Sequence, residues 1–278
     1  MIICIGNALV DSLQQIEEDV IDKLNLNKAR MTLVDKERSN FLLSNMPNPT
    51  YAAGGSAANT AYWIAALGGS VGFIGKVSDD DLGKQFRSSL SEHGLSDFTV
   101  LEEENEQTGL CAIFITPDGE RTMNTYLGAG EHLSVDDLNK NSISNAKILY
   151  MEGYLWDKSS SKEAFLHAAK INKETDGLNA ISLSDVFCVD MHQFYINNNC
   201  PVDGIIIEDK TIPVKNISHE FKNLDIFTGS GPEFSQIFKL RGLPTTILID
   251  RNGFEIGRIV GYIDFNDQSL IDWLTKNL

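Results

Sequence analysis

The sequence predicts an α/β protein with a mostly parallel β-sheet, on the basis of two patterns. Short apolar runs of the length of buried strands recur along the first 190 residues; they span 2–5, 71–74, 148–151 and 180–183. Helical patterns lie between them, as where Leu82, Phe86 and Leu90 recur four residues apart. Because alternating strands and helices form parallel sheets covered by helices, we expect this architecture here.

The ends of the predicted helices are marked by capping residues and glycines. A helix is expected over 56–67, with Ser56 as its N-cap. Gly68 and Gly69 end that helix, and Gly94 ends the helix of the next unit. Glycine suits these positions because it adopts the left-handed C-cap conformation without a steric penalty.

A β-hairpin is predicted between two of the α/β units. Its strands span 108–116 and 121–127, and Asp118-Gly119 between them is a strong turn signal. Inserted there, the hairpin would protrude from the sheet as a flap that excludes water from a bound substrate. The polar segment 30–49 carries no clear pattern.

The character of the sequence changes after about residue 190. Strands are expected at 204–207, 224–227, 245–250 and 255–260, with an Asn252-Gly253 turn before the last, and helices at 214–222, 233–240 and 268–278. We therefore predict a first domain over 1–190, a junction over 191–202 and a second domain over 203–278.

Composition excludes several classes of protein. The 278 residues carry a net charge of -16 and no basic run, which argues against nucleic acid and anionic membrane surfaces as partners. The four cysteines form no C-x-x-C pair and no cluster with metal spacing. The start lacks a signal-peptide pattern, and no apolar stretch is long enough to span a membrane. A reducing cytoplasm is the expected location.

A group of small polar residues and glycines predicts a substrate cradle. Asn7 and Asp11 follow the first strand, and Gly54, Gly55 and Asn59 form G-G-x-x-x-N at a helix start. A carboxylate accepts hydrogen bonds from two hydroxyls, an amide donates and accepts, and glycine lets the backbone approach a ligand. Each feature taken singly is more often a turn or a cap, so the prediction rests on their combination.

The combination resembles a known family. The segment GGSAANTAYWIAALGGSVGFIGKVSDDDLG, 54–83, is similar to the first signature of the ribokinase/PfkB carbohydrate kinases, and the opening CIGNALVD resembles their first strand. RTMNTYLGA, MEGYLWD and SLSDVFCVD resemble the branch that includes adenosine kinase-like proteins. This resemblance implies a ribokinase-like sheet with helices on both faces and a small β lid.

The resemblance also implies roles for individual residues. Asp11 would bind the hydroxyls of a sugar or nucleoside, in a pocket lined by Asn7, Gly54, Gly55 and Asn59. The lid strands would add three contacts, from Cys111, Ile113 and Tyr126. The family further implies ATP and Mg²⁺ as cofactors and a possible homodimer formed through the lid.

The family's catalytic motif is not found in this sequence. Its G-A-G-D aspartate takes the proton of the substrate hydroxyl, and the amides of that motif bind the transferred phosphoryl group. Segments 128–131 and 228–234 are similar to the motif. The first lies too early in the chain, and the second lacks the aspartate. We therefore leave the catalytic residue unknown and expect weak or no phosphoryl transfer.

The tail over 203–278 resembles the C-terminal part of thioredoxin-like proteins of the TlpA type, with Pro244 as the proline before a strand. Cys200 has no partner thiol nearby, so disulfide exchange is not expected. Four readings stay open: a sugar or nucleoside kinase, a binding module without chemistry, a thioredoxin-like protein without C-x-x-C, and a non-functional fusion product.

Overall fold

The structure is a computed structural model that describes residues 1–102, 106–182 and 184, together with four later strands. These strands are β13 (Gly204–Ile206), β14 (Asp225–Phe227), β15 (Thr245–Ile249) and β16 (Glu255–Val260). The chain divides into two compact units, Met1–Phe227 and Thr228–Leu278, which are described separately.

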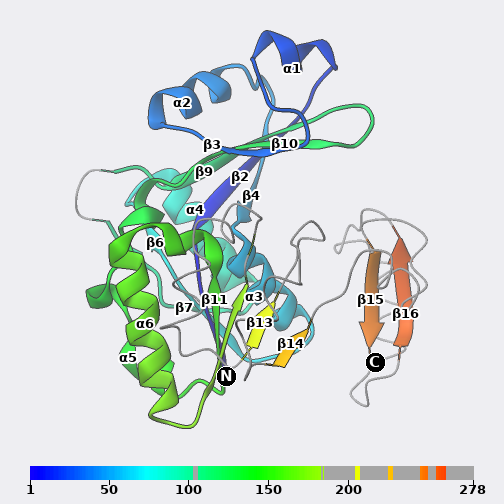
Figure 1. The fold of residues 1–278 in the computed structure, drawn as a ribbon. Helices are drawn as coiled ribbons and strands as arrows, with labels where there is room; N and C mark the ends of the chain where they lie inside the picture. Colours follow the sequence, from blue (N-terminus) through cyan, green and yellow to red (C-terminus); the bar gives the residue numbers. More distant parts are fainter. Residues whose placement is uncertain are drawn as a thin grey trace. The chain divides into compact units, whose positions relative to one another are not determined.

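The first unit is built on a seven-stranded sheet in the order β14-β13-β12-β11-β1-β5-β7, and every pair in it is parallel (Figure 1). The remaining strands of this sheet are β1 (Ile2–Ile5), β5 (Val71–Ile74), β7 (Ser96–Asp97), β11 (Ile148–Glu152) and β12 (Leu178–Ser182). The predicted α/β architecture with a mostly parallel sheet is confirmed.

Helices cover both faces of this sheet. They are α3 (Ser56–Ala66), α4 (Asp81–Glu92), α5 (Lys140–Ser144) and α6 (Ser159–Lys173), with short 3-10 turns η1 (Gly128–His132), η2 (Val135–Asp137) and η3 (Gly153–Asp157). Ile3 and Ile5 of β1 pack with Phe165 of α6, whereas Cys4 packs with Ala57 of α3. Since successive side chains of a strand point to opposite faces, α3 and α6 lie on opposite sides of the sheet.

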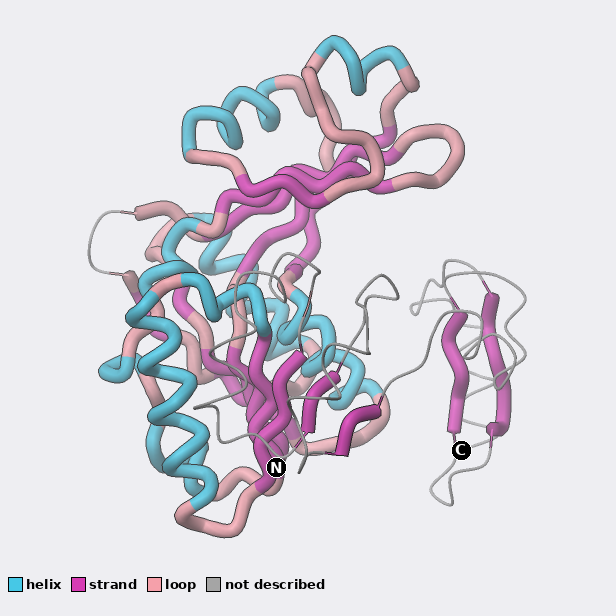
Figure 2. The backbone as a smooth tube through the Cα atoms, in the orientation of Figure 1, coloured by secondary structure: helices cyan, strands magenta, loops and turns pink. Residues whose placement is uncertain are grey.

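A second sheet of the first unit forms the lid. Its order is β3-β10-β9-β2-β4, and it stands at one end of the unit (Figures 1 and 2). Its strands are β2 (Leu9–Gln15), β3 (Met31–Leu33), β4 (Thr50–Gly54), β9 (Gly109–Ile115) and β10 (Arg121–Tyr126). The predicted hairpin is β9 and β10, which pair antiparallel as expected. The other three strands were not predicted.

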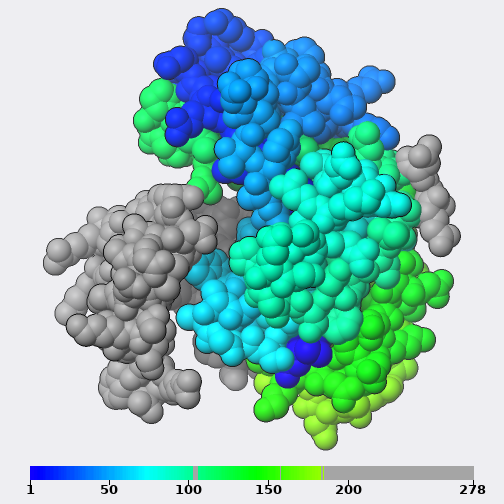
Figure 3. All heavy atoms as spheres, turned by 180° about the vertical axis from the view of Figure 1, so that it is seen from behind, coloured from blue at the N-terminus to red at the C-terminus, as the bar shows by residue number. Residues whose placement is uncertain are grey.

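Two helices cover one face of the lid sheet: α1 (Asp19–Lys23) and α2 (Lys36–Ser44). Their Ile21 and Leu42 pack in one cluster with Leu110, Ala112 and Phe114 of β9. The space-filling view from behind shows this part, in blue, projecting beyond the larger body (Figure 3). The opposite face of the lid sheet carries the residues that matter for the site.

The starts and ends of the helices follow local chemistry. Asp80 caps α4, because its Oδ1 accepts a hydrogen bond from the amide of Gly83 at 2.8 Å. Gly68 and Gly94 follow α3 and α4 with φ of 81° and 75°, as predicted for C-terminal glycines. The predicted N-cap of α3 was wrong: Gly55 occupies that position, and Ser56 is the first helical residue.

A separate two-stranded sheet consists of β6 (Lys76–Val77) and β8 (Val100–Leu101), which pair parallel with each other. In the second unit, β15 and β16 pair antiparallel from Thr245 opposite Val260, as the predicted hairpin requires. The turn at 252–253 and the three predicted helices of the tail lie outside the described residues. Among the residues described, no helix combines the length and apolar character needed to cross a bilayer.

The division between the units falls after Phe227, because β13 and β14 continue the parallel sheet of the first unit. Both strands belong to the region predicted to resemble thioredoxin-like proteins. The predicted junction, 191–202, lies outside the described residues, and the predicted domain boundary stays a prediction.

Candidate functional site

The residues predicted to form a cradle lie where the carboxyl ends of β1 and β11 meet the lid sheet and the start of α3. Asn7 follows β1, Glu152 ends β11, and Gly54 and Gly55 connect β4 to α3. Asp11 lies on β2 of the lid, between β4 and β9. In open α/β sheets the crevice outside the carboxyl ends of the strands is the usual place for ligands.

Asp11 shares one face of the lid sheet with two of the three predicted lid contacts, Cys111 and Ile113. Asp11 lies opposite Cys111 of β9 and opposite Ala52 of β4, and Ile113 is two residues beyond Cys111. Directly opposed residues, and residues two apart, point to the same side of a sheet. The other side packs on α1 and α2, so Asp11 lies on the side turned away from those helices.

Asp11 is partly buried, and this burial raises the pKa of its carboxyl group to about 6, with Arg121 acting in the opposite direction. No hydrogen bond to this carboxylate is found among the described residues. A partly buried carboxylate without a protein donor can accept hydrogen bonds from hydroxyl groups of a ligand. Asp11 is therefore the strongest candidate for a ligand contact.

Gly54 and Gly55 hold positions that other residues could not occupy. A Cβ on Gly54 would lie 2.3 Å from Oδ1 of Asp11. Gly55 has a φ of 96°, and a Cβ there would lie 2.2 Å from the carbonyl oxygen of Asn7. The two glycines thus let the turn before α3 pass close to both polar residues.

Asn7 lies beneath this turn and pairs with Glu152. Its Nδ2 donates to Oε1 of Glu152 at 2.7 Å, and only 1% of the Asn7 surface is exposed. The same carboxylate accepts from the backbone amide of Ala57, in the first turn of α3, at 2.9 Å. In this conformation the Asn7 side chain is buried under the Gly54-Gly55 turn and does not line the surface of the candidate site.

Glu152 was not among the predicted site residues, although it belongs to the MEGYLWD segment. It is 1% exposed, and burial raises the pKa of its carboxyl group while the amides of Ala57 and Asn7 oppose that rise. The available signal was its position as the last residue of an apolar strand, next in the sheet to the strand that precedes Asn7.

Cys111 is a buried, unreactive thiol. Burial is the main cause that raises its pKa to about 12, and the nearby charge of Asp11 adds to the effect. Oγ1 of Thr125 on the neighbouring strand donates to its sulfur at 3.2 Å. Cys111 therefore offers no nucleophile, and its predicted contact with a ligand would be apolar.

Two predicted residues are placed differently. Asn59 lies exposed on α3, one turn beyond Gly55, and its backbone amide donates to the Gly55 carbonyl at 2.8 Å. Tyr126 faces away from Asp11: its hydroxyl donates to the Glu106 carboxylate. With Leu110 it lines a cavity of about 280 Å³ on the α2 side of the lid. The structure does not bring Tyr126 together with Asp11.

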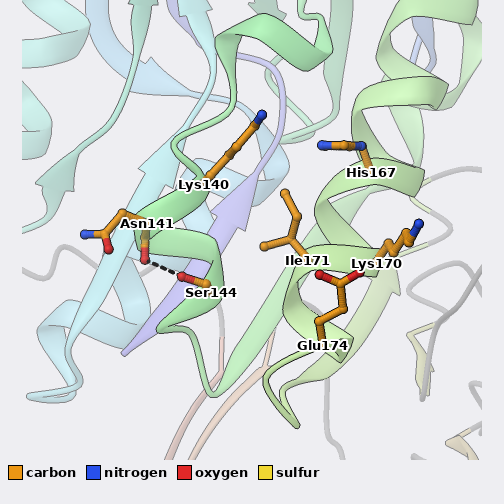
Figure 4. A pocket seen from close by; sticks show the side chains of 7 residues that line it. All are labelled: Lys140, Asn141, Ser144, His167, Lys170, Ile171 and Glu174. Atoms are coloured by element: carbon orange, nitrogen blue, oxygen red, sulfur yellow. Dashed lines mark hydrogen bonds between the residues drawn. The ribbon is translucent and has the colours of Figure 1, made fainter.

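A larger cavity of about 470 Å³ lies away from these residues, between α5 and α6 (Figure 4). It contains none of the predicted site residues, and its lining includes Lys140, His167 and Glu174. Within the described residues, no group of three or more His, Cys, Asp or Glu could hold a metal ion. No metal site is assigned.

A parallel sheet covered on both faces by helices, with a small β lid over the ends of its strands, defines the ribokinase-like fold. The pfkB family carbohydrate kinase model matches residues 20–193, and the chain belongs to that family. The resemblance of the sequence to the PfkB carbohydrate kinases is confirmed. The match ends before the tail, whose resemblance to thioredoxin-like proteins stays a prediction.

Individual relatives include kinases of nucleosides and of sugars. Adenosine kinase from Sinorhizobium meliloti is 36% identical, with a TM-score of 0.69 over 73% of this chain and 63% of that chain. The probable sugar kinase from Rhizobium etli is 33% identical, with a TM-score of 0.72 over 79% of this chain and 71% of that chain.

Among curated proteins, probable fructokinase-3 of Arabidopsis thaliana is 31% identical over 142 residues, which are 50% of this chain and 41% of the relative. The chain spans about half the length of the curated relatives it matches.

Proposed function

We propose that the first unit of this chain binds the acceptor substrate of a sugar or nucleoside kinase. The observation that carries the proposal is the position of Asp11, a partly buried carboxylate with no hydrogen-bond partner among the described residues. It lies against Gly54, on the face of the lid sheet that does not pack on α1 and α2. Membership of the pfkB family supports a polyhydroxylated ligand at this place.

The chemistry of the site fits such a ligand. The two oxygens of Asp11 would accept hydrogen bonds from two neighbouring hydroxyls, and charge-assisted bonds of this kind are stronger than neutral ones. The turn at Gly54 and Gly55 would bring backbone groups within reach of the same ligand. Cys111 and Ile113, on the same face, would cover its less polar side.

The relatives support two substrate classes. Adenosine kinase and a probable sugar kinase are both similar to this chain at more than 30% identity. A nucleoside and a free sugar share the vicinal hydroxyls that Asp11 would recognise. The base of a nucleoside would need an additional apolar surface, for which Cys111 and Ile113 are the candidates.

Kinases of this family generally use ATP and Mg²⁺. No residue is assigned to either group here, because the described residues contain no metal-ligand cluster and the 278 residues contain no G-A-G-D. We propose that these 278 residues by themselves transfer phosphate weakly or not at all. Binding of the acceptor without chemistry is therefore the second candidate function.

Titration calorimetry tests the proposal directly. The chain is titrated with adenosine, ribose and fructose, and at least one of them is expected to bind. Asp11→Ala is expected to abolish that binding, whereas Tyr126→Phe, on the opposite face of the lid, leaves it unchanged. Absence of binding by all three compounds, or equal loss in both variants, contradicts the proposal.

A turnover assay with ATP, Mg²⁺ and the bound compound separates the two candidate functions. A typical kinase turns over at about 1–100 s⁻¹. Turnover in that range would overturn the proposed lack of catalysis while leaving the binding proposal intact. Turnover far below it, with binding retained, would favour the binding role.

A further inference from the structure

Glu152 is a buried carboxylate that accepts several hydrogen bonds. Its Oε1 accepts from Nδ2 of Asn7 at 2.7 Å and weakly from the Asn7 backbone amide at 3.4 Å, and its Oε2 accepts from the Ala57 amide at 2.9 Å. These groups come from three elements far apart in sequence: the end of β11, the loop after β1 and the first turn of α3.

The surroundings of Glu152 leave it little freedom. A Cβ on Gly6 would lie 2.5 Å from its Oε2, so the end of β1 also passes close to the carboxylate. Removing a carboxylate from water costs several kcal/mol unless hydrogen bonds and charge compensate. Here the compensation comes from the side-chain amide of Asn7 and from backbone amides, including one at a helix N-terminus, where negative charge is favoured.

The contacts continue from Glu152 to the candidate site. The Ala57 amide, which donates to Glu152, lies two residues beyond Gly55. Gly55 in turn lies close to the carbonyl oxygen of Asn7, since a Cβ on Gly55 would be 2.2 Å from that oxygen. Gly54, the next residue back along the chain, lies against the carboxylate of Asp11. The position of this turn therefore depends on both partners of Glu152.

We propose that Glu152 is a positioning residue for the acceptor site: its carboxylate joins Asn7 to the start of α3 and thereby fixes the Gly54-Gly55 turn against Asp11. This proposal rests on the proposed function only where its test measures ligand binding. Glu152 itself is buried, so it acts through the turn and does not touch the ligand.

The first test substitutes Glu152→Gln, which keeps the size of the side chain. An amide cannot accept hydrogen bonds at both of its ends, so the bond to Asn7 or the bond to Ala57 is lost. The substitution is expected to weaken ligand binding about 10-fold, the size of effect expected from one charge-assisted hydrogen bond. Glu163→Gln, which removes an exposed charge of α6, is the matched control and leaves binding unchanged.

The double variant Asn7→Asp with Glu152→Gln restores the pair with donor and acceptor exchanged. The glutamine Oε1 can then accept from Ala57 while its Nε2 donates to the new carboxylate at position 7. Recovery of most of the lost affinity is expected. A double variant that binds no better than Glu152→Gln alone contradicts the proposal.

A second readout needs no ligand. The pKa of Asp11, measured by NMR titration of its carboxyl carbon, is expected to fall toward the ordinary aspartate value in Glu152→Gln, because a displaced turn buries Asp11 less. A purely structural role would lower the melting temperature and leave this titration unchanged. A folded Glu152→Gln variant with an unaltered Asp11 titration overturns the proposal.

The outcomes separate the two proposals. If the parent chain binds none of the three compounds, the proposed function fails, and the Asp11 titration still decides the role of Glu152. If Glu152→Gln does not fold, Glu152→Asp keeps the charge but cannot reach both Asn7 and Ala57, and it is measured in the same way. If neither variant folds, Glu152 is a residue of the fold alone and the positioning role is rejected.

Discussion

Replacing Asp11 by Asn is expected to make the protein more stable at neutral pH and unable to bind its ligand. The pKa of Asp11 is raised from the ordinary value of 3.8 to about 6. At 1.36 kcal/mol for each pKa unit, this difference corresponds to about 3 kcal/mol of unfolding free energy. Because the pKa is raised, the stabilising contribution is complete below about pH 3.8 and is lost as the pH rises through about 6.

At pH 7.5 the ionised Asp11 therefore destabilises the fold, and Asp11→Asn removes that cost. We expect the variant to gain up to about 3 kcal/mol at pH 7.5, and the gain to shrink steadily between about pH 6 and pH 4. Urea unfolding at four pH values between 4.5 and 7.5, followed by tryptophan fluorescence, measures the difference in unfolding free energy.

Asp118 provides a control for which the expected change in stability has the opposite sign. It is exposed at the tip of the lid hairpin, and its hydrogen bond to Lys28 is the main cause that lowers its pKa. Asp118→Asn should therefore cause a small loss of stability at pH 7.5 rather than a gain. A gain for Asp11→Asn that does not vary with pH, or a loss at pH 7.5, would refute this account of the site.

Two further substitutions test the geometry. Gly54→Ala places a Cβ 2.3 Å from Oδ1 of Asp11, so ligand affinity should fall at least about 10-fold while circular dichroism stays native; unchanged affinity would show that the turn can move freely. Phe114→Ala removes a fully buried ring between the lid sheet and α2, and chemical unfolding should show a loss of about 3–5 kcal/mol; a loss below about 1 kcal/mol would mean that the lid core is loosely packed.

The main sheet could be predicted from sequence because its strands are apolar throughout. Val71–Ile74 is buried at every position, and such runs between amphipathic helices are typical of parallel sheets. The lid was harder to predict. Leu9–Gln15, reading LVDSLQQ, does not separate apolar from polar residues by face, because Leu9 and Leu13 lie on the same face as Asp11.

The site was predicted in part for similar reasons. Asp11 and the glycine pair belong to two short segments, each of which can be read locally in the sequence. The face of a lid residue depends on strand register, and a shift of one residue exchanges the two faces. Thr125 lies opposite Cys111 on the Asp11 side, whereas Tyr126 lies opposite Leu110 on the other side. Register comes from pairing across the sheet, which the sequence of one strand does not encode.

Glu152 illustrates a different limit. A carboxylate at the end of a strand is usually exposed, and nothing beside it in the sequence indicates full burial. Its partners, Asn7 and Ala57, lie 145 and 95 residues away along the chain. Only the order of the strands, which places β11 beside β1, brings these groups together.

The central claim is that a polyhydroxylated ligand binds on the Asp11 face of the lid. Chemical-shift mapping by ¹H–¹⁵N NMR, recorded with and without the ligand found by calorimetry, tests it most directly. We expect the amides of Asp11, Gly54, Gly55 and Cys111 to shift, and those of α2 to stay in place. Shifts confined to the cavity beside His167, or to the α2 side of the lid, would contradict the claim.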